Sequence, residues 1–231
     1  MNRIFIFTLF LSLFAWGGCS NLEVAENHNE AGQLVERFTR DPKTKLKEGL
    51  HETFFTSNGG KSAESNYKAG VLHGEQIFYY ENGQIMERRN YDKTGSFTGA
   101  FKAFHESGAL RSEGQYENGA MTGKWKFFYK SGNIKEIIFY RDNVENGPFI
   151  EYYDNGKISA EGTYANELEH GLLKIYDDKG NLTMQKQCEN GVCRTVWKSD
   201  LAKDSTKKLW VISYKLWVIS YELWVISGVI W

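Results

Sequence analysis

One phrase of eighteen residues recurs along the chain, and its spacing constrains the fold more than any other feature. It is clearest at residues 123–140, where it reads GKWKFFYKSGNIKEIIFY. Five copies open with glycines spaced 25, 24, 24 and 24 residues apart, and each has a second glycine nine residues later. These ten glycines are Gly74, Gly83, Gly99, Gly108, Gly123, Gly132, Gly147, Gly156, Gly171 and Gly180. Such a period is typical of an array in which each copy packs against its neighbours.

The chemistry within each copy is that of a β-hairpin. The residues at the second glycine read ENG, ESG, KSG, DNG and DKG, which are turn sequences because glycine adopts positive φ cheaply. Apolar residues recur with a period near two, and a helix would lose about 1 kcal/mol at each interior glycine. We therefore predict an all-β fold, an elongated single-layer antiparallel meander of about eleven or twelve strands, with all ten glycines at turns.

Aromatic residues concentrate in the first strand of each copy. They are candidates for contacts with a partner because aromatic side chains anchor interfaces at low entropic cost. The residues we single out are Tyr80, Trp125, Tyr129 and Tyr153. The alternative is that these rings only stabilise the sheet through cross-strand contacts. In two copies Gly114 and Gly162 lie in the second strand, where we expect a neighbouring ring to cover the bare backbone.

The pattern G-x-x-x-x-F/Y-F/Y-x-x-G-x-I/L, followed by Tyr, resembles the MORN-repeat variant of bacterial proteins often labelled as YwqK-type antitoxins. The resemblance covers about residues 50–180, including a degenerate copy at Leu50–Tyr67. It implies a β-meander that serves as a binding or scaffolding surface. The label also suggests an alternative function, an antitoxin-like partner that neutralises a toxin protein, which an exported protein would fit poorly.

The first nineteen residues read as a bacterial lipoprotein signal. Arg3 precedes the apolar run Ile4–Trp16, and Gly-Gly-Cys resembles a lipobox whose Cys19 becomes acylated. The alternative is ordinary signal-peptidase cleavage without acylation. We expect export, with anchoring to the cell envelope and, by analogy from Ser20, to the outer membrane. We interpret the polar residues 20–48 as a tether, with a short helix near Glu30–Thr39 as one reading.

We assign the repeat array to residues 49–194. At its end Cys188 and Cys193 flank Glu-Asn-Gly-Val, a further hairpin turn that would bring the two thiols close enough for a disulfide in an oxidising compartment. Residues 195–208 read as a linker. The tail at 209–231 repeats LWVISY in heptads, and the simplest explanation is a translated DNA repeat. The alternatives are an added β segment and a membrane-surface segment.

Neither charge nor motifs point to an enzyme or to nucleic acid. The net charge is −1, so no general basic field is present. We find no catalytic constellation, no metal site and no cofactor motif, and we assign a turn role to His73 and His170 because each precedes an opening glycine. The expected partners are the membrane through the N-terminal lipid, and a protein or an envelope polysaccharide. An open sheet edge would also permit self-association.

Overall fold

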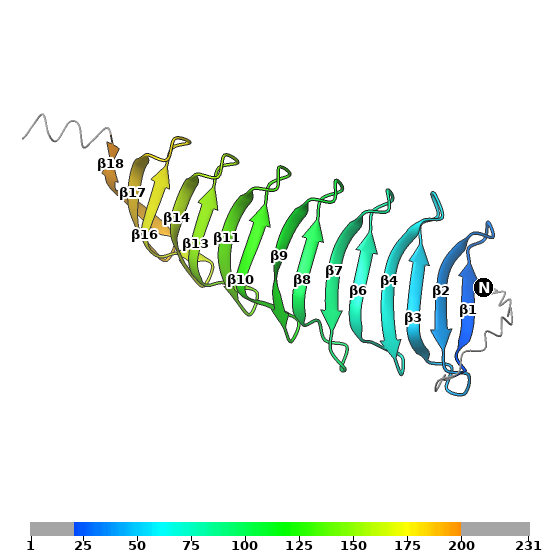
Figure 1. Cartoon of the computed structure of the whole chain (residues 1–231). Coiled ribbons are helices and arrows are strands. Elements are labelled where there is room, and N and C mark those ends of the chain that lie inside the picture. The colour runs from blue at the N-terminus through cyan, green and yellow to red at the C-terminus, as the bar shows by residue number, and fades with distance from the viewer. Residues whose placement is uncertain (1–20, 200–231) are drawn as a thin grey trace, which may run out of the picture.

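The computed structural model describes residues 21–199, which form one antiparallel sheet of eighteen strands. Figure 1 shows a long ribbon in which the hairpins follow one another in chain order. The strands are β1 Glu23–His28, β2 Leu34–Arg40, β3 Lys47–Phe54, β4 Lys61–Lys68, β5 Val71–Leu72, β6 Gly74–Tyr79, β7 Ile85–Tyr91, β8 Gly99–Phe104, β9 Leu110–Glu117, β10 Ala120–Phe128, β11 Ile134–Arg141, β12 Val144–Glu145, β13 Gly147–Tyr152, β14 Ile158–Ala165, β15 Leu168–Glu169, β16 Gly171–Tyr176, β17 Leu182–Glu189 and β18 Val192–Lys198. The single-layer meander is confirmed, but the predicted strand number was too low.

The hairpin of β10 and β11 illustrates the repeating unit. Gly123 pairs with Tyr140 and Trp125 pairs with Ile138, so the start of one strand faces the end of the next. At the turn the Gly132 N–H donates to the Tyr129 carbonyl (3.0 Å). The positive φ of 92° at Gly132 explains why glycine stands there. The second glycine of each copy therefore lies in a turn, as the sequence predicts. We call the edge formed by these turns the tip edge.

The opening glycines differ from the prediction, because they lie in bulges rather than in turns. The bulge is inside β10 at Gly123 and at the start of a strand in the other four copies. Between β10 and β9 the register jumps from Thr122 opposite Gln115 to Lys126 opposite Glu113. Four steps along β10 thus match two steps along β9, and Gly123, with φ 65°, lies in the bulge. The same bulge separates the two-residue strands β5, β12 and β15 from β6, β13 and β16, which raises the strand count.

The tether predicted for residues 20–48 was wrong, as was the helix near Glu30–Thr39. β1 and β2 form a hairpin from Glu23 to Arg40, and β3 follows beside β2. The turn between β1 and β2 has the same hydrogen bond as the turns of the later copies, from the Gly32 N–H to the Asn29 carbonyl (2.9 Å). The array therefore begins at least one hairpin earlier than residue 49.

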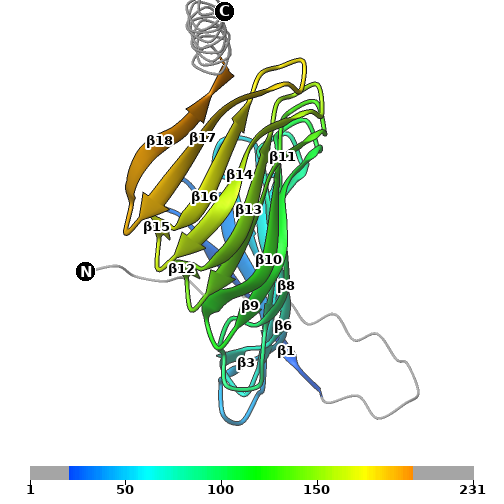
Figure 2. The same ribbon diagram turned by 90° about the vertical axis from the view of Figure 1, so that its left-hand side faces the viewer.

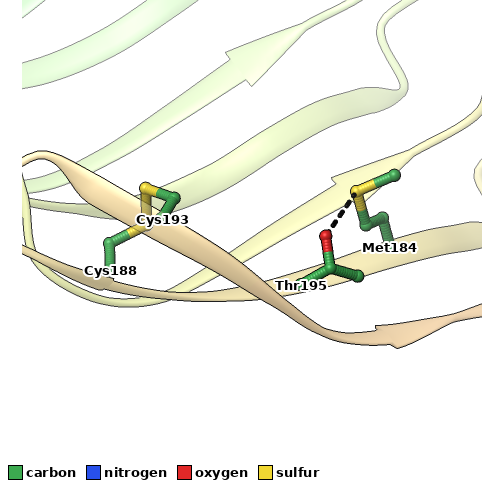
Figure 3. Close-up of a disulfide and its surroundings, with 4 residues drawn as sticks. All are labelled: Met184, Cys188, Cys193 and Thr195. Carbon is green, nitrogen blue, oxygen red and sulfur yellow. Dashed lines mark hydrogen bonds between the residues drawn. A yellow bond between two sulfur atoms is a disulfide. The ribbon is translucent and has the colours of Figure 1, made fainter.

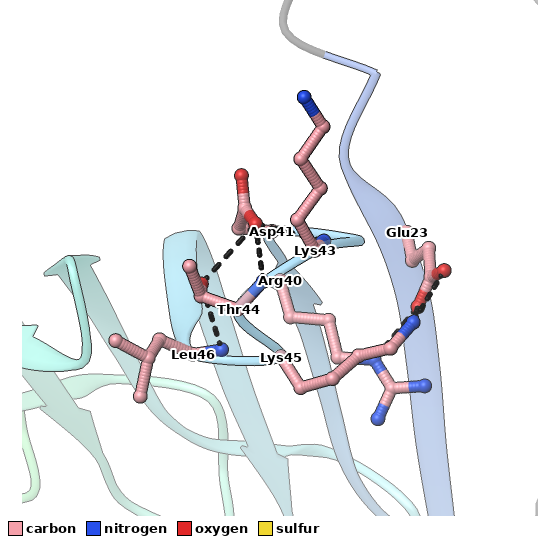
Figure 4. A network of polar contacts seen from close by, with 7 residues as sticks. All are labelled: Glu23, Arg40, Asp41, Lys43, Thr44, Lys45 and Leu46. Atoms are coloured by element: carbon pink, nitrogen blue, oxygen red, sulfur yellow. Dashed lines mark hydrogen bonds and ion pairs between the residues drawn. The ribbon is translucent and has the colours of Figure 1, made fainter.

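Polar contacts join β1 to the β2–β3 turn (Figure 4). The Glu23 carboxylate receives Arg40 Nε at 3.0 Å and Lys45 Nζ at 2.8 Å. In the turn Asp41 Oδ1 accepts the backbone N–H groups of Lys43 (2.9 Å) and Thr44 (2.7 Å). Exposed ion pairs contribute little individually, so the turn conformation depends mainly on the Asp41 cap.

Aromatic rings pack on one face of the sheet, which we call the ring face. Phe101, Trp125 and Phe149 stand two residues after successive opening glycines and are 9%, 2% and 4% exposed. Figure 2, which looks along the ribbon, shows the strands rotating steadily from β10 to β18. A single layer buries these rings because they cover one another: the Phe101 and Trp125 centroids are 5.4 Å apart. Trp125 also covers Gly114, as the sequence predicts.

The last hairpin in the described part of the chain is formed by β17 and β18. Cys188 and Cys193 face each other across this hairpin and form a disulfide (Figure 3). β18 continues to Lys198, so residues 195–198 belong to the array and not to the predicted linker. No helix in the described part of the chain is long and apolar enough to cross a membrane. The signal segment with Cys19 and the heptad tail at 209–231 lie outside the described residues.

Candidate binding surface

The face opposite the ring face, which we call the charged face, carries alternating charges. Lys126 Nζ lies 2.9 Å from Glu113 Oε1, and Lys174 Nζ lies 2.8 Å from Glu161 Oε1. Both pairs join neighbouring strands across the gap between hairpins. Their side chains are about one third exposed, so the pairs are screened by water and add little stability. The charged face is therefore a solvated surface with local charge balance.

Trp125 is not available for contact with a partner. Its side chain is among the most deeply buried in the described residues, in contact with Gly114 and with the rings of Phe101 and Tyr116. Its Nε1 atom is buried without a hydrogen-bond partner. The prediction of Trp125 as a binding residue was wrong, because alternation along a strand does not reveal which face is covered by its own rings.

The other three predicted contact residues form a ladder of hydroxyl groups along the tip edge, which we call the hydroxyl ladder. Tyr80 Oη donates to the Phe104 carbonyl (2.9 Å), Tyr129 Oη to the Tyr152 carbonyl (2.6 Å) and Tyr153 Oη to the Tyr176 carbonyl (2.9 Å). Each bond connects one hairpin to the next. The alternative reading of these rings, as stabilisers of the sheet, accounts for all three hydroxyls. Their half-buried rings still line the tip edge.

Asparagine side chains form a second set of ties at the same edge. The Nδ2 atoms of Asn58, Asn82 and Asn155 donate to carbonyl groups of the following turn at 2.8, 3.0 and 2.8 Å. The acceptors are the carbonyls of Glu81, Glu106 and Asp178. Since side-chain hydrogen bonds hold consecutive turns in place, the tip edge is a regular and stiff line of groups rather than a set of free loops.

The hydroxyl ladder is interrupted at two positions. Phe55 stands at the position that Tyr80, Tyr129 and Tyr153 occupy in three later copies, and phenylalanine has no hydroxyl group. His105 stands in the next copy, and its Nε2 atom is buried without a hydrogen-bond partner. Two shallow depressions of about 410 and 420 Å³ both border Phe55. Both depressions therefore lie beside a departure from the repeat.

Two carboxylates face each other on neighbouring strands of the ring face. Glu136 of β11 pairs directly with Glu151 of β13. Burial, then the charges of Glu151 and Glu145, raise the pKa of the Glu136 carboxyl above its ordinary value. Burial and the charge of Glu145 likewise raise the pKa of Tyr164 to about 12. In residues 21–199 no group of three or more His, Cys, Asp or Glu is arranged to hold a metal ion.

The two histidines assigned to turns lie in the bulges instead. The His73 N–H donates to the Asn66 carbonyl and the His170 N–H to the Thr163 carbonyl, both at 2.8 Å. Each residue directly precedes an opening glycine, so its backbone joins the short strand to the long one. These backbone hydrogen bonds give both histidines a structural role in the bulge.

Comparison with protein families finds the MORN repeat variant at four successive segments, residues 72–93, 97–118, 121–142 and 145–166. Each segment spans one hairpin of the sheet, as residues 121–142 span β10 and β11. A search of curated proteins finds no match to the chain. The chain thus contains four tandem copies of this repeat, and hairpins of the same form continue the sheet on both sides of them.

Proposed function

We propose that the protein is a non-enzymatic scaffold of the bacterial cell envelope, which binds a protein or a polysaccharide along its ribbon. The four MORN repeat variant copies support a repeat scaffold. The observation that carries the proposal is the regular set of side-chain ties along the tip edge. Because these ties hold most of the hairpins against the next one, the ribbon presents groups at nearly fixed intervals, which favours binding to an extended partner.

The size of the ribbon fits this role. Of the eighteen strands, β5, β12 and β15 each continue into the next strand, which leaves fifteen positions across the sheet. At a spacing of ~4.8 Å between neighbouring strands these positions extend over ~70 Å. A surface of this length can contact several units of a polymer or several copies of a protein at once.

The anchor that we propose is a lipid on Cys19. Only residues 20–22 separate Cys19 from the start of β1. An acylated Cys19 would therefore hold the β1 end of the ribbon next to the membrane, with the disulfide hairpin at the far end. Metabolic labelling with an alkynyl fatty acid is expected to mark the full-length protein and not the Cys19→Ala variant. Equal absence of label from both proteins would rule out the anchor.

The scaffold role is tested by affinity capture from envelope extract with the full-length chain. We expect a protein or a glycan to be retained, with retention reduced when hairpins are removed from the array. Recovery of a single stoichiometric toxin would instead favour the antitoxin-like alternative. If neither protein nor glycan is retained above a scrambled-sequence control, the proposed function is wrong.

A further inference from the structure

One row of side chains crosses the charged face from β8 to β17. The strand registers place each member of the row directly opposite the next, so their order along the ribbon is fixed. We call this set the central row. In order it reads Lys102, Glu113, Lys126, Ile137, Ile150, Glu161, Lys174 and Gln185.

The middle of the central row is apolar. Ile137 of β11 lies opposite Ile150 of β13, whereas the gaps between hairpins on either side carry the two ion pairs described above. Phe139 and Pro148 lie two residues farther along the same strands and widen the apolar patch. Neither isoleucine is fully buried, and Pro148 is exposed. An apolar patch framed by charged side chains is typical of a surface that binds another protein.

The charges of the central row are complementary to their own reversed order. Counted from the isoleucine pair, Lys126 and Glu161 occupy equivalent places on the two sides, as do Glu113 and Lys174. A two-fold axis parallel to the strands, lying above the isoleucine pair, places a second copy face to face with the row reversed. Lys126 then faces Glu161 of the second copy, and Glu113 faces its Lys174. A two-fold axis along the ribbon would instead oppose like charges.

We propose that the charged face binds a second copy of this chain through this two-fold contact, which goes beyond the proposed function. Ile137 stacks on Ile150 of the second copy at the centre. Each carboxylate of the central row lies between one ammonium group of its own chain and one of the second copy, so the covered charges are paired. Because the axis is parallel to the strands, both β1 strands begin at the same edge of the dimer. That arrangement suits two lipid anchors in one membrane.

Four more cations lie along the charged face or at the bulges beside it, between β8 and β17. In the proposed contact each of them faces an uncharged side chain of the second copy. The facing pairs are Lys102 with Gln185, Lys124 with Thr163, Arg111 with Tyr176 and Lys135 with Tyr152. These cations leave each face with an excess of positive charge. We therefore expect a moderate affinity, measured at physiological ionic strength where the excess is screened.

The contact is large enough for a dimer of moderate affinity. The strands from β9 to β16 occupy six positions, because β12 and β15 each continue into the next strand. These positions extend over ~29 Å, and six residues along each strand over ~20 Å. The two faces together would cover ~1,200 Å², the lower end of standard interfaces. Two sheets of the same twist pack ~10 Å apart with their strands within ~30° of each other. We expect a Kd on the order of 10 µM.

The test mixes two charge-reversal variants of the full-length protein in detergent. Lys126→Glu alone opposes two carboxylates at each symmetric contact, and Glu161→Lys alone opposes two ammonium groups. We expect each variant alone to dimerise roughly 30-fold more weakly than the wild type in sedimentation velocity. An equimolar mixture should regain most of the wild-type affinity, because each reversed charge then meets its complement. Native mass spectrometry should identify the mixed dimer.

A second pair of variants separates the contact from folding. Ile137→Thr keeps a β-branched side chain but removes apolar area from the centre of the contact, so it should weaken dimerisation about tenfold. Ile77→Thr is the matched control and should leave the affinity unchanged. Ile77 lies on the charged face in β6, opposite Glu64, outside the strands that meet.

Three results would overturn the inference. The first is a wild-type protein that is monomeric at ~200 µM, about twenty times the expected Kd. The second is a mixture of the two charge variants that dimerises no better than either variant alone. The third is equal weakening by Ile137→Thr and Ile77→Thr. The affinity capture that tests the proposed function is independent of all three.

Discussion

At the scale of single residues, the ring face depends on places where a side chain is absent. A Cβ atom added to Gly114 would lie 2.2 Å from Trp125 Cδ2, well inside any permitted contact. A Cβ atom at Gly162 would lie 2.8 Å from Phe149 Cε1, a less severe overlap. Neither glycine has a positive φ, so glycine stands at both positions because a ring lies on the backbone.

Gly114→Ala is expected to destabilise the protein by about 1–3 kcal/mol, because the added methyl group displaces the Trp125 ring. Gly162→Ala should lose less stability, since the Phe149 ring is farther from the added Cβ atom. Gly60→Ala is the control, because its Cβ atom would meet only the flexible Asn58 side chain. Urea unfolding measures all three. Equal midpoints for Gly114→Ala and Gly60→Ala would contradict the packing described for Trp125.

The Glu136–Glu151 pair predicts a pH-dependent gain from removing a charge. The pKa of Glu136 is raised in the folded protein, so the folded state binds more protons than the unfolded state above the ordinary carboxyl pKa. Stability from this group is therefore present at acidic pH and is lost as the pH rises through its folded pKa. Glu136→Gln should raise Tm near pH 7.5 and have little effect near pH 3, where the carboxyl is protonated in both states.

Glu161→Gln is the mirror-image control. Hydrogen bonds from Lys174 and Tyr176 lower the pKa of Glu161, so its contribution to stability is present above the ordinary carboxyl pKa and disappears in acid. This variant should lower Tm at neutral pH and have no effect near pH 3. A fall in Tm for both variants at neutral pH would argue against repulsion at Glu136.

At the scale of the element, one tyrosine hydroxyl ties a hairpin to the next in the three copies that contain Tyr80, Tyr129 and Tyr153. Tyr153→Phe removes the bond to the Tyr176 carbonyl and is expected to lower the free energy of unfolding by about 1 kcal/mol. Tyr80→Phe should have the same effect, and the two losses should add, because the sites are several strands apart. Chemical denaturation of the single and double variants measures this. Losses of stability near zero would show that water replaces the hydrogen bonds of the hydroxyl ladder.

Sequence reasoning recovered the hairpins because turn chemistry is local. Gly83 and its equivalents have to adopt positive φ where two strands reverse, and their neighbours are turn residues. It missed the bulges at the opening glycines, since a positive φ serves a bulge as well as a turn. The missed β1–β2 hairpin had a signal: EAGQLVER at 30–37 matches ENGQIMER at 81–88. In that hairpin Ala25 stands where three later copies have Phe101, Trp125 and Phe149, and the opening glycine is absent.

The candidate site was less predictable than the fold for a physical reason. A period of two predicts Trp125 and Tyr129 on the same face of one strand, but it does not say which rings are covered by neighbouring copies. The depressions arise where the repeat is broken, at Phe55. The sequence shows that Phe55 lacks a hydroxyl group, but only the strand register shows which carbonyl group a tyrosine at this position would reach.

At the scale of the whole molecule, the ribbon is a one-dimensional array. Each hairpin contacts its neighbours along the chain (Figure 1), and within residues 21–199 β1 and β18 each pair with one strand. In such arrays stability is close to a sum of unit and interface terms, so opening can begin at either end. The disulfide between Cys188 and Cys193 closes the last hairpin and should resist opening from that end.

This architecture predicts that equal local damage has different consequences at different places. Gly132 and Gly180 occupy equivalent turns with φ of 92° and 88°, and an added Cβ atom finds no close contact at either. Alanine at either position should therefore lower the free energy of unfolding by a similar ~1–2 kcal/mol, because the left-handed backbone is the only source of strain. Gly180→Ala should accelerate amide exchange in β16, β17 and β18 by roughly 5–30-fold and leave β10 and β11 unchanged. Gly132→Ala should accelerate exchange in β10 and β11 and leave β17 and β18 at the wild-type rate. Exchange mass spectrometry resolves these strands, and a uniform increase in either variant would show that the sheet opens as one cooperative unit instead.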